Sequence, residues 1–236
     1  IMAGLVGSEM CIRDREWILE QGGKSVPWFK GSGTAWEMPF SRGLAEGKTR
    51  EMLIALHETG RITRQEIVSM IPVLALQVST GDYVLDMCAS PGSKTTQISE
   101  YLGEGGVVFA NEISNSRVNT LVSNVHRHGS KSAVIINHDG RHLPKMPNRG
   151  FDKVLVDAPC TGSATTRKNP EVWQKWTPEG GRSLHDLQIE LLRNAVKLTR
   201  PGGRIVYSTC SLDPVENEAV VACLLYTSDA ADDTTG

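Results

Sequence analysis

The fold of this chain is decided by residues 83–94, Tyr83-Val84-Leu85-Asp86-Met87-Cys88-Ala89-Ser90-Pro91-Gly92-Ser93-Lys94. Residues 83–87 are mostly apolar, which is typical of a buried strand. Residues 88–93 are small, contain a glycine and predict a tight turn. A helical pattern follows from Lys94 to Leu102. A strand, a glycine turn and a helix in this order predict the start of a parallel α/β sheet.

The alternation of strands and helices continues on the C-terminal side of this stretch. Further strands are predicted at residues 107–111, 133–137, 153–157 and 204–209, and helices at 114–128, 183–198 and after Pro214. Parallel strands joined by right-handed helical crossovers form the doubly wound class. We therefore predict an α/β fold with a doubly wound, mainly parallel sheet.

Composition places the chain among ordinary soluble globular proteins. It has 236 residues, of which 39% are hydrophobic and 22% charged, and no apolar run approaches the ~20 residues of a membrane span. The five cysteines are scattered, which favours a reducing compartment, and no zinc-type spacing predicts a metal site. The net charge of −2 argues against a strongly basic nucleic-acid binder. However, residues 225–236 hold three aspartates, and a grouped basic patch can still bind RNA.

The two ends of the sequence differ from the part between them. Residues 1–15 and 225–236 lack a period that continues into their neighbours, and we expect both to be foreign to the fold. Residues 16–48 are predicted to be irregular. A helix is predicted at 49–59, and Thr63-Arg64-Gln65-Glu66 has the spacing of a capping box that starts a second helix. The predicted catalytic domain covers residues 81–224.

Cys160 and Cys210 each follow a predicted strand and are each followed by a small hydroxyl residue. A single cysteine in such a place is usually a small buried hydrophobic residue. Two of them at the carboxyl ends of strands, where the ligands of open α/β sheets bind, instead favour covalent catalysis. Cys88 lies at the same edge, but we interpret it as a small residue of the glycine turn.

Three features suggest a cofactor that contains adenosine. The glycine turn opens a helix, whose free amides favour a carboxylate or phosphate. Glu112 ends the second strand, where an acid can bind two ribose hydroxyls, and Asp139 follows the third strand. The alternative interpretation is ordinary turns with solvated acids.

Residues 165–176 alternate cations with aromatic and amide side chains. Arg167, Lys168, Asn169 and Lys175 could contact phosphates, while Trp173 and Trp176 could stack on bases. In the alternative interpretation, the two tryptophans pack on the core and the cations are solvated.

Four ordered motifs resemble the RsmB/Nop-type (Nop/Sun) family of RNA cytosine-5 methyltransferases. They are Asp86-Met87-Cys88-Ala89-Ser90-Pro91-Gly92-Ser93-Lys94-Thr95, Asn137-His138-Asp139, Asp157-Ala158-Pro159-Cys160-Thr161-Gly162 and Tyr207-Ser208-Thr209-Cys210-Ser211-Leu212. The likeness covers about Arg50 to Leu224. The segments 62–72 and 167–169 look most like the eukaryotic branch that modifies tRNA.

This resemblance implies a class I, Rossmann-like methyltransferase that uses S-adenosylmethionine. Cys210 would be the nucleophile that attacks carbon 6 of cytosine, Cys160 would assist proton removal or product release, and Asp157 would hydrogen-bond the ring. The resemblance implies a cofactor site lined by Cys88, Ala89, Ser90, Pro91, Gly92, Ser93, Lys94, Glu112, Asp139 and Asp157.

Further expectations concern the whole protein. Residues 16–80 would be the remnant of an N-terminal RNA-binding region with a helical lead-in, and we expect further strands beyond the last helix to be missing. The expected partner is RNA, specifically tRNA, bound by a monomer without a membrane or metal. The expected location is the nucleus, with cytoplasm and mitochondrion as alternatives. The alternative functions are an RNA-binding scaffold and a nucleotide-dependent oxidoreductase.

Overall fold

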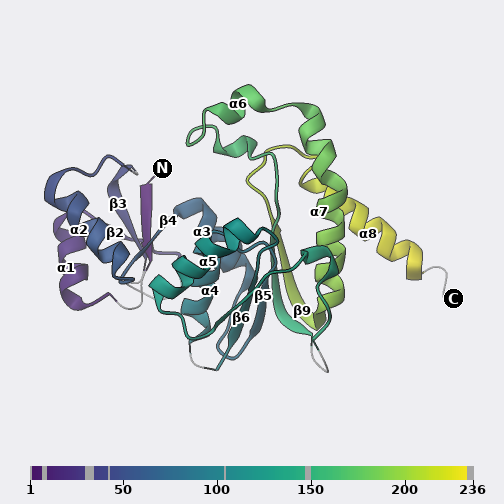
Figure 1. Ribbon diagram of the computed structural model, residues 1–236, viewed down its shortest axis with the longest axis horizontal. Coiled ribbons are helices and arrows are strands. Elements are labelled where there is room, and N and C mark those ends of the chain that lie inside the picture. The colour runs from purple at the N-terminus through teal and green to yellow at the C-terminus, as the bar shows by residue number, and fades with distance from the viewer. Residues whose placement is uncertain are drawn as a thin grey trace.

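The structure is a computed structural model that describes residues 2–6, 10–29, 35–41, 43–103, 105–146 and 150–232. It contains a four-stranded sheet near the N-terminus and a five-stranded sheet that forms the centre of the molecule (Figure 1). The predicted leader and tail fall partly outside the described residues, at 1, 7–9 and 233–236.

The five-stranded sheet is parallel throughout. Its strands lie in the order β7-β6-β5-β8-β9. Their bounds are β5 (Tyr83–Asp86), β6 (Val107–Asn111), β7 (Ala133–Ile136), β8 (Phe151–Asp157) and β9 (Thr199–Ser208). The predicted doubly wound parallel sheet is thereby confirmed.

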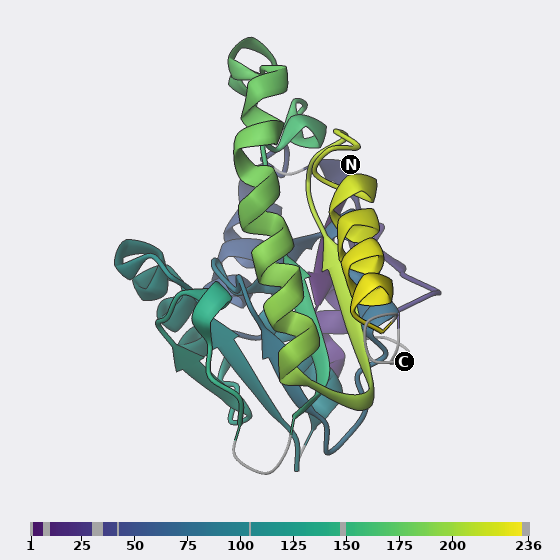
Figure 2. The same ribbon diagram turned by 90° about the vertical axis from the view of Figure 1, so that its right-hand side faces the viewer.

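Helices cover both faces of this sheet, as Figures 1 and 2 show. One face carries α3 (Ile67–Leu76), α4 (Ser93–Leu102) and α5 (Asn115–His128), and the other carries α7 (Pro178–Leu198) and α8 (Glu218–Asp232). Neighbouring strand residues point to opposite faces. Accordingly, Val84 packs in the cluster with Ile98 of α4, while Leu85 packs in the cluster with Leu192 of α7.

The strand order creates a crevice at the carboxyl edge of the sheet. From β5 the chain moves outward through β6 to β7, and then returns to the other side of β5 with β8 and β9. Ligands of open α/β sheets bind where the order reverses in this way. The segments at this edge include η1 (Gly140–His142), η2 (Ser163–Thr165) and α6 (Glu171–Lys175).

The N-terminal part folds into a small antiparallel sheet, so the prediction of irregular structure for residues 16–48 was wrong. Its strands are β1 (Met2–Val6), β2 (Lys24–Ser25), β3 (Ala35–Ser41) and β4 (Thr63–Glu66), in the order β2-β3-β1-β4. The helices α1 (Ile12–Glu20) and α2 (Gly47–Glu58) accompany it. The buried side chains of Met10, Ile18, Met38 and Leu56 form its core.

Parts of both end segments belong to regular elements. β1 pairs with β3 and β4, and α8 continues through residue 232. The foreign origin of residues 1–15 and 225–236 remains a prediction.

The predicted capping box at Thr63–Glu66 is also wrong. These residues form β4, which pairs with β1, and α3 begins afterwards at Ile67. Pairing with a strand that is distant in the sequence supplies the backbone hydrogen bonds that a local cap would have supplied.

The residues Pro201-Gly202-Gly203, which directly precede the strand predicted at 204–209, lie inside β9. The register with β8 shifts between the pairs Phe151–Thr199 and Lys153–Arg204, and Gly202 has φ +75°. The extra residues therefore form a bulge, and the strand begins earlier than the sequence predicted.

Two kinds of feature are absent from the described residues. No helix there combines the length and the apolar character needed to cross a membrane. The same residues contain no group of three or more His, Cys, Asp or Glu side chains arranged to hold a metal ion.

Candidate active site

The glycine turn that follows β5 brings α4 close to α5. The amide of Ala89 donates to the carbonyl of Asn111 at 2.8 Å, and the amide of Gly92 donates to the carbonyl of Ala89 at 2.7 Å. Gly92 has φ +106°, and an added Cβ would lie 3.0 Å from Cδ1 of Leu121. Glycine is therefore required here both by the backbone conformation and by the close approach of the helix.

Burial raises the pKa of two ionisable side chains beneath this turn. Asp86 is fully buried and accepts a hydrogen bond from Oγ1 of Thr95 at 2.8 Å. Burial raises the pKa of Asp86 to about 7. Burial also raises the pKa of the Cys88 thiol, which therefore stays protonated. A protonated thiol is a poor nucleophile, and this is consistent with a packing role for Cys88.

Glu112 and Asp139 lie at the carboxyl ends of β6 and β7. The Glu112 carboxylate is buried, accepts from the Ser114 amide at 2.9 Å and lies 3.4 Å from the Arg117 guanidinium. The hydrogen bonds from Arg141 lower the pKa of Asp139 to about 2. Both acids are thus placed at the edge where the sequence predicted them.

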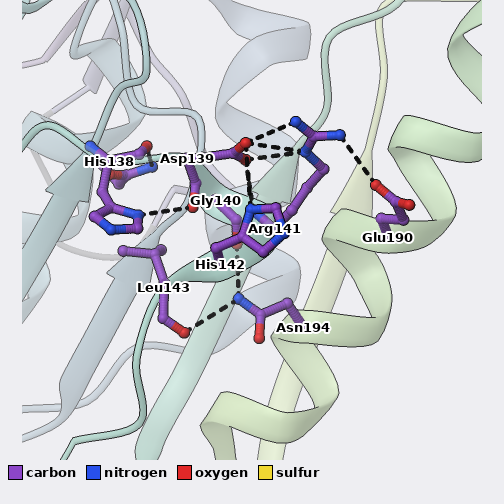
Figure 3. Close-up of polar contacts among 9 residues, drawn as sticks. His138, Asp139, Gly140, Arg141, His142, Leu143, Glu190 and Asn194 are labelled. Carbon is purple, nitrogen blue, oxygen red and sulfur yellow. Dashed lines mark hydrogen bonds and ion pairs between the residues drawn. The ribbon is translucent and has the colours of Figure 1, made fainter.

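Figure 3 shows how the turn that contains Asp139 is fixed to α7. Arg141 donates to both oxygens of Asp139 and, at 3.2 Å, to the Glu190 carboxylate. Nδ2 of Asn194 donates to the carbonyl of Gly140 at 2.7 Å. The position of Asp139 therefore depends on α7 as well as on its own strand.

The residues at this edge have the chemistry that S-adenosylmethionine requires. Oδ1 of Asp86 is buried and has no hydrogen-bond partner within the described part of the chain, so it can accept from an ammonium group. A carboxylate has about four acceptor positions, which leaves Glu112 able to accept from ribose hydroxyls. The side chain of Asp139 is 24% exposed and so remains accessible to a ligand.

Asp157 ends β8 and connects the glycine turn to β9. Its Oδ2 accepts from Nζ of Lys94 at 2.7 Å, and its Oδ1 accepts from Oγ of Ser208 at 2.7 Å. Lys94 belongs to the first turn of α4. One carboxylate thus joins the strand ends to the helix that begins at the glycine turn.

The two cysteines that the sequence singled out lie next to each other. Sγ of Cys160 and Sγ of Cys210 are 3.2 Å apart, and the Cys210 amide lies 3.3 Å from Sγ of Cys160. Cys210 is exposed, and both cysteines are free thiols. Residues 50 positions apart therefore form one pair at the carboxyl edge, as their places after two strands predicted.

The pair is electrostatically asymmetric. A hydrogen bond from Cys160 lowers the pKa of Cys210 to about 7, although burial acts in the opposite direction. The same hydrogen bond, together with burial, raises the pKa of Cys160. Cys210 is therefore the thiol that ionises first, and the thiolate is the nucleophilic form.

Glu216 holds the loops that carry both cysteines, and no pattern in the sequence pointed to this role. The Glu216 side chain is buried and accepts from the amide of Thr161 at 2.9 Å and from Nε2 of Gln188 at 3.2 Å. It also accepts from the hydroxyls of Thr161 and Ser211, which directly follow Cys160 and Cys210. One carboxylate thus clamps both cysteine loops.

The segment predicted to bind RNA, residues 165–176, includes α6 and lies beyond the carboxyl edge of the sheet (Figure 1). Trp173 is 79% exposed and Trp176 is 42% exposed, so the alternative in which both pack on the core is wrong. Lys168 and Arg167 both pair with Glu66, and Lys175 pairs with Glu171 at 2.6 Å. The Asn169 amide donates to the carbonyl of Thr165 at 2.9 Å.

A protein family described as 16S rRNA methyltransferase RsmB/F matches residues 73–235. This match includes β5 to β9, the glycine turn and both cysteines. The chain belongs to this family. The resemblance inferred from the four motifs is therefore confirmed.

Named relatives and a solved structure agree with this family. The chain is 39% identical to the Saccharomyces cerevisiae multisite-specific tRNA:(cytosine-C(5))-methyltransferase, over 84% of the chain and 32% of that protein. It is 39% identical to the Drosophila melanogaster tRNA (cytosine(34)-C(5))-methyltransferase, over 87% of the chain and 30% of that protein. A methyltransferase homologue from Pyrococcus horikoshii superposes with a TM-score of 0.73 at 30% identity, over 95% of this chain and 70% of that one.

The chain thus spans about a third of the length of these two tRNA methyltransferases. The RsmB/F match begins at residue 73, after β4. Two further residues of the matched region contact the site residues predicted from the sequence. Ser208 donates a hydrogen bond to Asp157, and Glu216 accepts one from Thr161, which follows Cys160. Both contacts join segments that are far apart in the chain.

Proposed function

We propose that the protein containing this chain transfers a methyl group from S-adenosylmethionine to carbon 5 of cytosine in RNA, and that its substrate is tRNA. The observation that carries this proposal is the pair of thiols 3.2 Å apart at the carboxyl edge. Membership of the RsmB/F family and the names of the tRNA-modifying relatives support it.

The first step is attack on the base. Carbon 5 of cytosine is a weak nucleophile, so the Cys210 thiolate forms a bond from sulfur to carbon 6 and makes carbon 5 electron-rich. Asp157 accepts a hydrogen bond from the exocyclic amino group of cytosine. The Lys94 ammonium, 2.7 Å from Asp157, keeps a positive charge close to the ring as negative charge develops there.

The cofactor supplies the methyl group as an electrophile attached to a sulfonium. The glycine turn, Asp86, Glu112 and Asp139 would hold it at the same edge of the sheet as the cysteine pair. After carbon 5 has accepted the methyl group, its proton must leave, the bond between carbon 6 and Cys210 must break, and the ring double bond returns.

Cys160 acts in this second half of the reaction. Its pKa is raised chiefly because it donates a hydrogen bond to Cys210. That cause disappears when Cys210 is bonded to carbon 6, because the sulfur then carries no negative charge. Cys160 therefore becomes easier to ionise in the adduct, and its thiolate can accept the proton from carbon 5.

The nucleophile is tested by Cys210→Ala in the full-length protein. Because the substitution removes the attacking atom, we expect methyl transfer from labelled S-adenosylmethionine to tRNA to fall at least about a thousandfold. Cys223→Ala, on α8, is the matched control and keeps its activity. Undiminished transfer by the Cys210 variant would contradict the proposal, and lack of transfer by the unaltered protein in single-turnover assays would favour an RNA-binding scaffold.

The release step is tested by Cys160→Ala. This variant can form the bond to carbon 6 but completes the reaction poorly, so we expect a covalent protein–RNA species on a denaturing gel. The double variant with Cys210→Ala should lose that species. An adduct that persists in the double variant would show that another residue forms the bond.

A further inference from the structure

A polar pocket outside the cysteine site lies between the N-terminal sheet and the glycine turn. It has a volume of about 110 Å³. Its walls come from the end of α2, from β4, from the first turn of α4 and from α5. The lining residues are His57, Thr63, Arg64, Gly92, Ser93, Thr96, Asn124 and Arg127.

The charge of this pocket is positive. Its lining contains no acidic residue. Arg64 and Arg127 have no ion-pair partner in the described part of the chain. Arg127 instead donates to the carbonyl of His57 at 2.8 Å and to Oδ1 of Asn124 at 3.2 Å.

The two guanidinium groups act on each other and on His57. Burial and then the field of Arg64 lower the pKa of Arg127, and Glu58, which does not line the pocket, acts in the opposite direction. Burial, Arg127 and Arg64 lower the pKa of His57 to about 4, so its ring is neutral at pH 7. An anion between the two arginines would relieve their mutual repulsion.

One wall of the pocket carries a hydroxyl group without a hydrogen-bond partner among the described residues. Thr63 is 5% exposed, and its Oγ1 has no hydrogen-bond partner among the described residues. A buried hydroxyl without a partner costs free energy, so its presence in a polar pocket points to a ligand that accepts from it.

The size of the pocket admits a small anion. One water molecule needs only about 10–15 Å³ of such cavity space, so 110 Å³ has room for a group of several heavy atoms. A tetrahedral phosphate has this size, and its oxygens can accept from guanidinium, hydroxyl and backbone amide groups together.

The pocket lies beside the proposed path of RNA. Ser93 in its wall directly precedes Lys94, whose ammonium contacts Asp157. Arg64 and Glu66 are two residues apart in β4 and therefore share a face of the strand. Glu66 pairs with Lys168 in the segment that exposes Trp173.

We propose that this pocket binds a phosphate group of the RNA backbone at a nucleotide near the target cytosine. The proposal deepens the proposed function and rests on it in taking RNA as the ligand. Arg64 and Arg127 neutralise the phosphate, and Thr63 donates a hydrogen bond to it. The pocket thereby couples the N-terminal sheet to the position of the substrate strand.

The test measures binding of a tRNA-derived oligonucleotide to the 236-residue chain by fluorescence anisotropy at several salt concentrations. Arg64→Gln removes one charge at an exposed side chain without an ion pair. We expect roughly tenfold weaker binding at low salt. Each lost phosphate contact should also reduce the slope of log K against log salt by about 0.7.

The matched control is Arg193→Gln, an exposed arginine on α7 at the opposite face of the sheet. It should bind RNA with the affinity and salt slope of the unaltered chain, and neither variant should alter S-adenosylmethionine binding. Equal affinity and slope for Arg64→Gln and the unaltered chain would overturn the proposal, as would failure of the unaltered chain to bind RNA.

Thr63→Val separates ligand binding from a structural role, because valine has a similar shape but no hydroxyl. It removes a buried group without a partner, so the free protein should melt at a higher temperature while its affinity for RNA falls. A rise in melting temperature with unchanged RNA affinity would contradict the role of Thr63.

Inorganic phosphate provides the last arm of the experiment. If phosphate alone stabilises the chain in an Arg64-dependent way while RNA binding does not depend on Arg64, the ligand is free phosphate and the RNA assignment is wrong. If Arg64-dependent RNA binding persists but no methyl transfer occurs, the proposed function fails while this inference stands.

Discussion

The acidity of the Cys210 thiol is raised chiefly by one neighbouring residue. A hydrogen bond from Cys160 lowers its pKa to about 7, although burial would raise it. The thiolate fraction of Cys210 therefore rises as the pH increases through 7 and is nearly complete above pH 8. An unperturbed thiol would need about pH 8.5 for half ionisation.

This acidity can be measured directly. We expect the rate of Cys210 alkylation by iodoacetamide, followed by mass spectrometry of the peptide, to have its midpoint near pH 7. Cys160→Ala removes the hydrogen bond and should move that midpoint upward by one or two pH units. The urea-unfolded chain provides the reference, and an identical midpoint in both folded forms would show that Cys160 does not tune Cys210.

For individual residues, the sequence predicted where the site residues lie better than it predicted which residues they contact. Cys160, Cys210 and Asp157 could be placed because each follows a strand of a parallel sheet. Their partners Ser208 and Glu216 could not, because these contacts join loops that are separated by about 50 residues.

Among the elements, the ends of β8 and β9 are held together by Glu216. Burial raises the pKa of this carboxyl, but hydrogen bonds from Ser211 and Thr161 outweigh burial and lower it overall. Glu216 is therefore ionised at neutral pH and accepts from residues on both cysteine loops. We infer that it is a positioning residue for the cysteine pair.

Glu216→Gln tests this role, because the amide keeps the size but presents a donor to groups that need an acceptor. We expect kcat to fall roughly 10- to 100-fold with little change in the KM for S-adenosylmethionine, and stability to fall by about 1–3 kcal/mol. The alkylation midpoint of Cys210 should also shift.

Glu218→Gln, an exposed substitution two residues further on, is the matched control and should change none of these quantities. If Glu216→Gln lowers only the melting temperature and leaves kcat and the alkylation midpoint unchanged, Glu216 has a structural role alone.

The strands and helices also show why some parts of the fold were predicted from the sequence and others were not. Alternating apolar strands and helices from Tyr83 onward carry their own local signal, and the sheet was predicted correctly. Thr63–Glu66 has a local signal for a helix start, but β1 pairs with it as a strand. The pairing strand β1 lies within residues 1–15, which the sequence analysis predicted to be foreign to the fold, so a local pattern could not predict this pairing.

Across the whole molecule, the N-terminal sheet is joined to the central domain by polar and apolar contacts. Nε2 of Gln65 donates to Gln97 at 2.9 Å, and Gln97 donates to the carbonyl of Met70 at 3.1 Å. The rings of Phe29 and Tyr101 are 5.5 Å apart. The extent of this contact could not be predicted, because residues 16–48 have no clear periodicity.

A substitution at Gly60 can show how closely the N-terminal part must approach α5 of the central domain. Gly60 has φ +76°, and an added Cβ would overlap the carbonyl oxygen of Arg127 in α5. We expect Gly60→Ala to lower the free energy of unfolding by roughly 2 kcal/mol or more, measured by chemical denaturation. Limited proteolysis should then cleave the N-terminal part more rapidly.

Gly81→Ala is the control, because Gly81 also has a positive φ, +86°, but open space around its Cα. It should cost only the backbone strain, roughly 1–2 kcal/mol. Equal losses for the two variants would mean that the contact with Arg127 contributes nothing to the docking of the N-terminal sheet.

The exposure of Trp173 and Trp176 makes the arrival of a nucleic acid optically visible. Trp36 is 6% exposed and shielded in the N-terminal core, whereas Trp173 is 79% exposed. Indole emission depends on contact with solvent, and a base stacked on Trp173 would quench it. Intrinsic fluorescence would therefore time the encounter with RNA separately from methyl transfer and without a label, and the part of the signal that Trp173→Phe loses would report on Trp173.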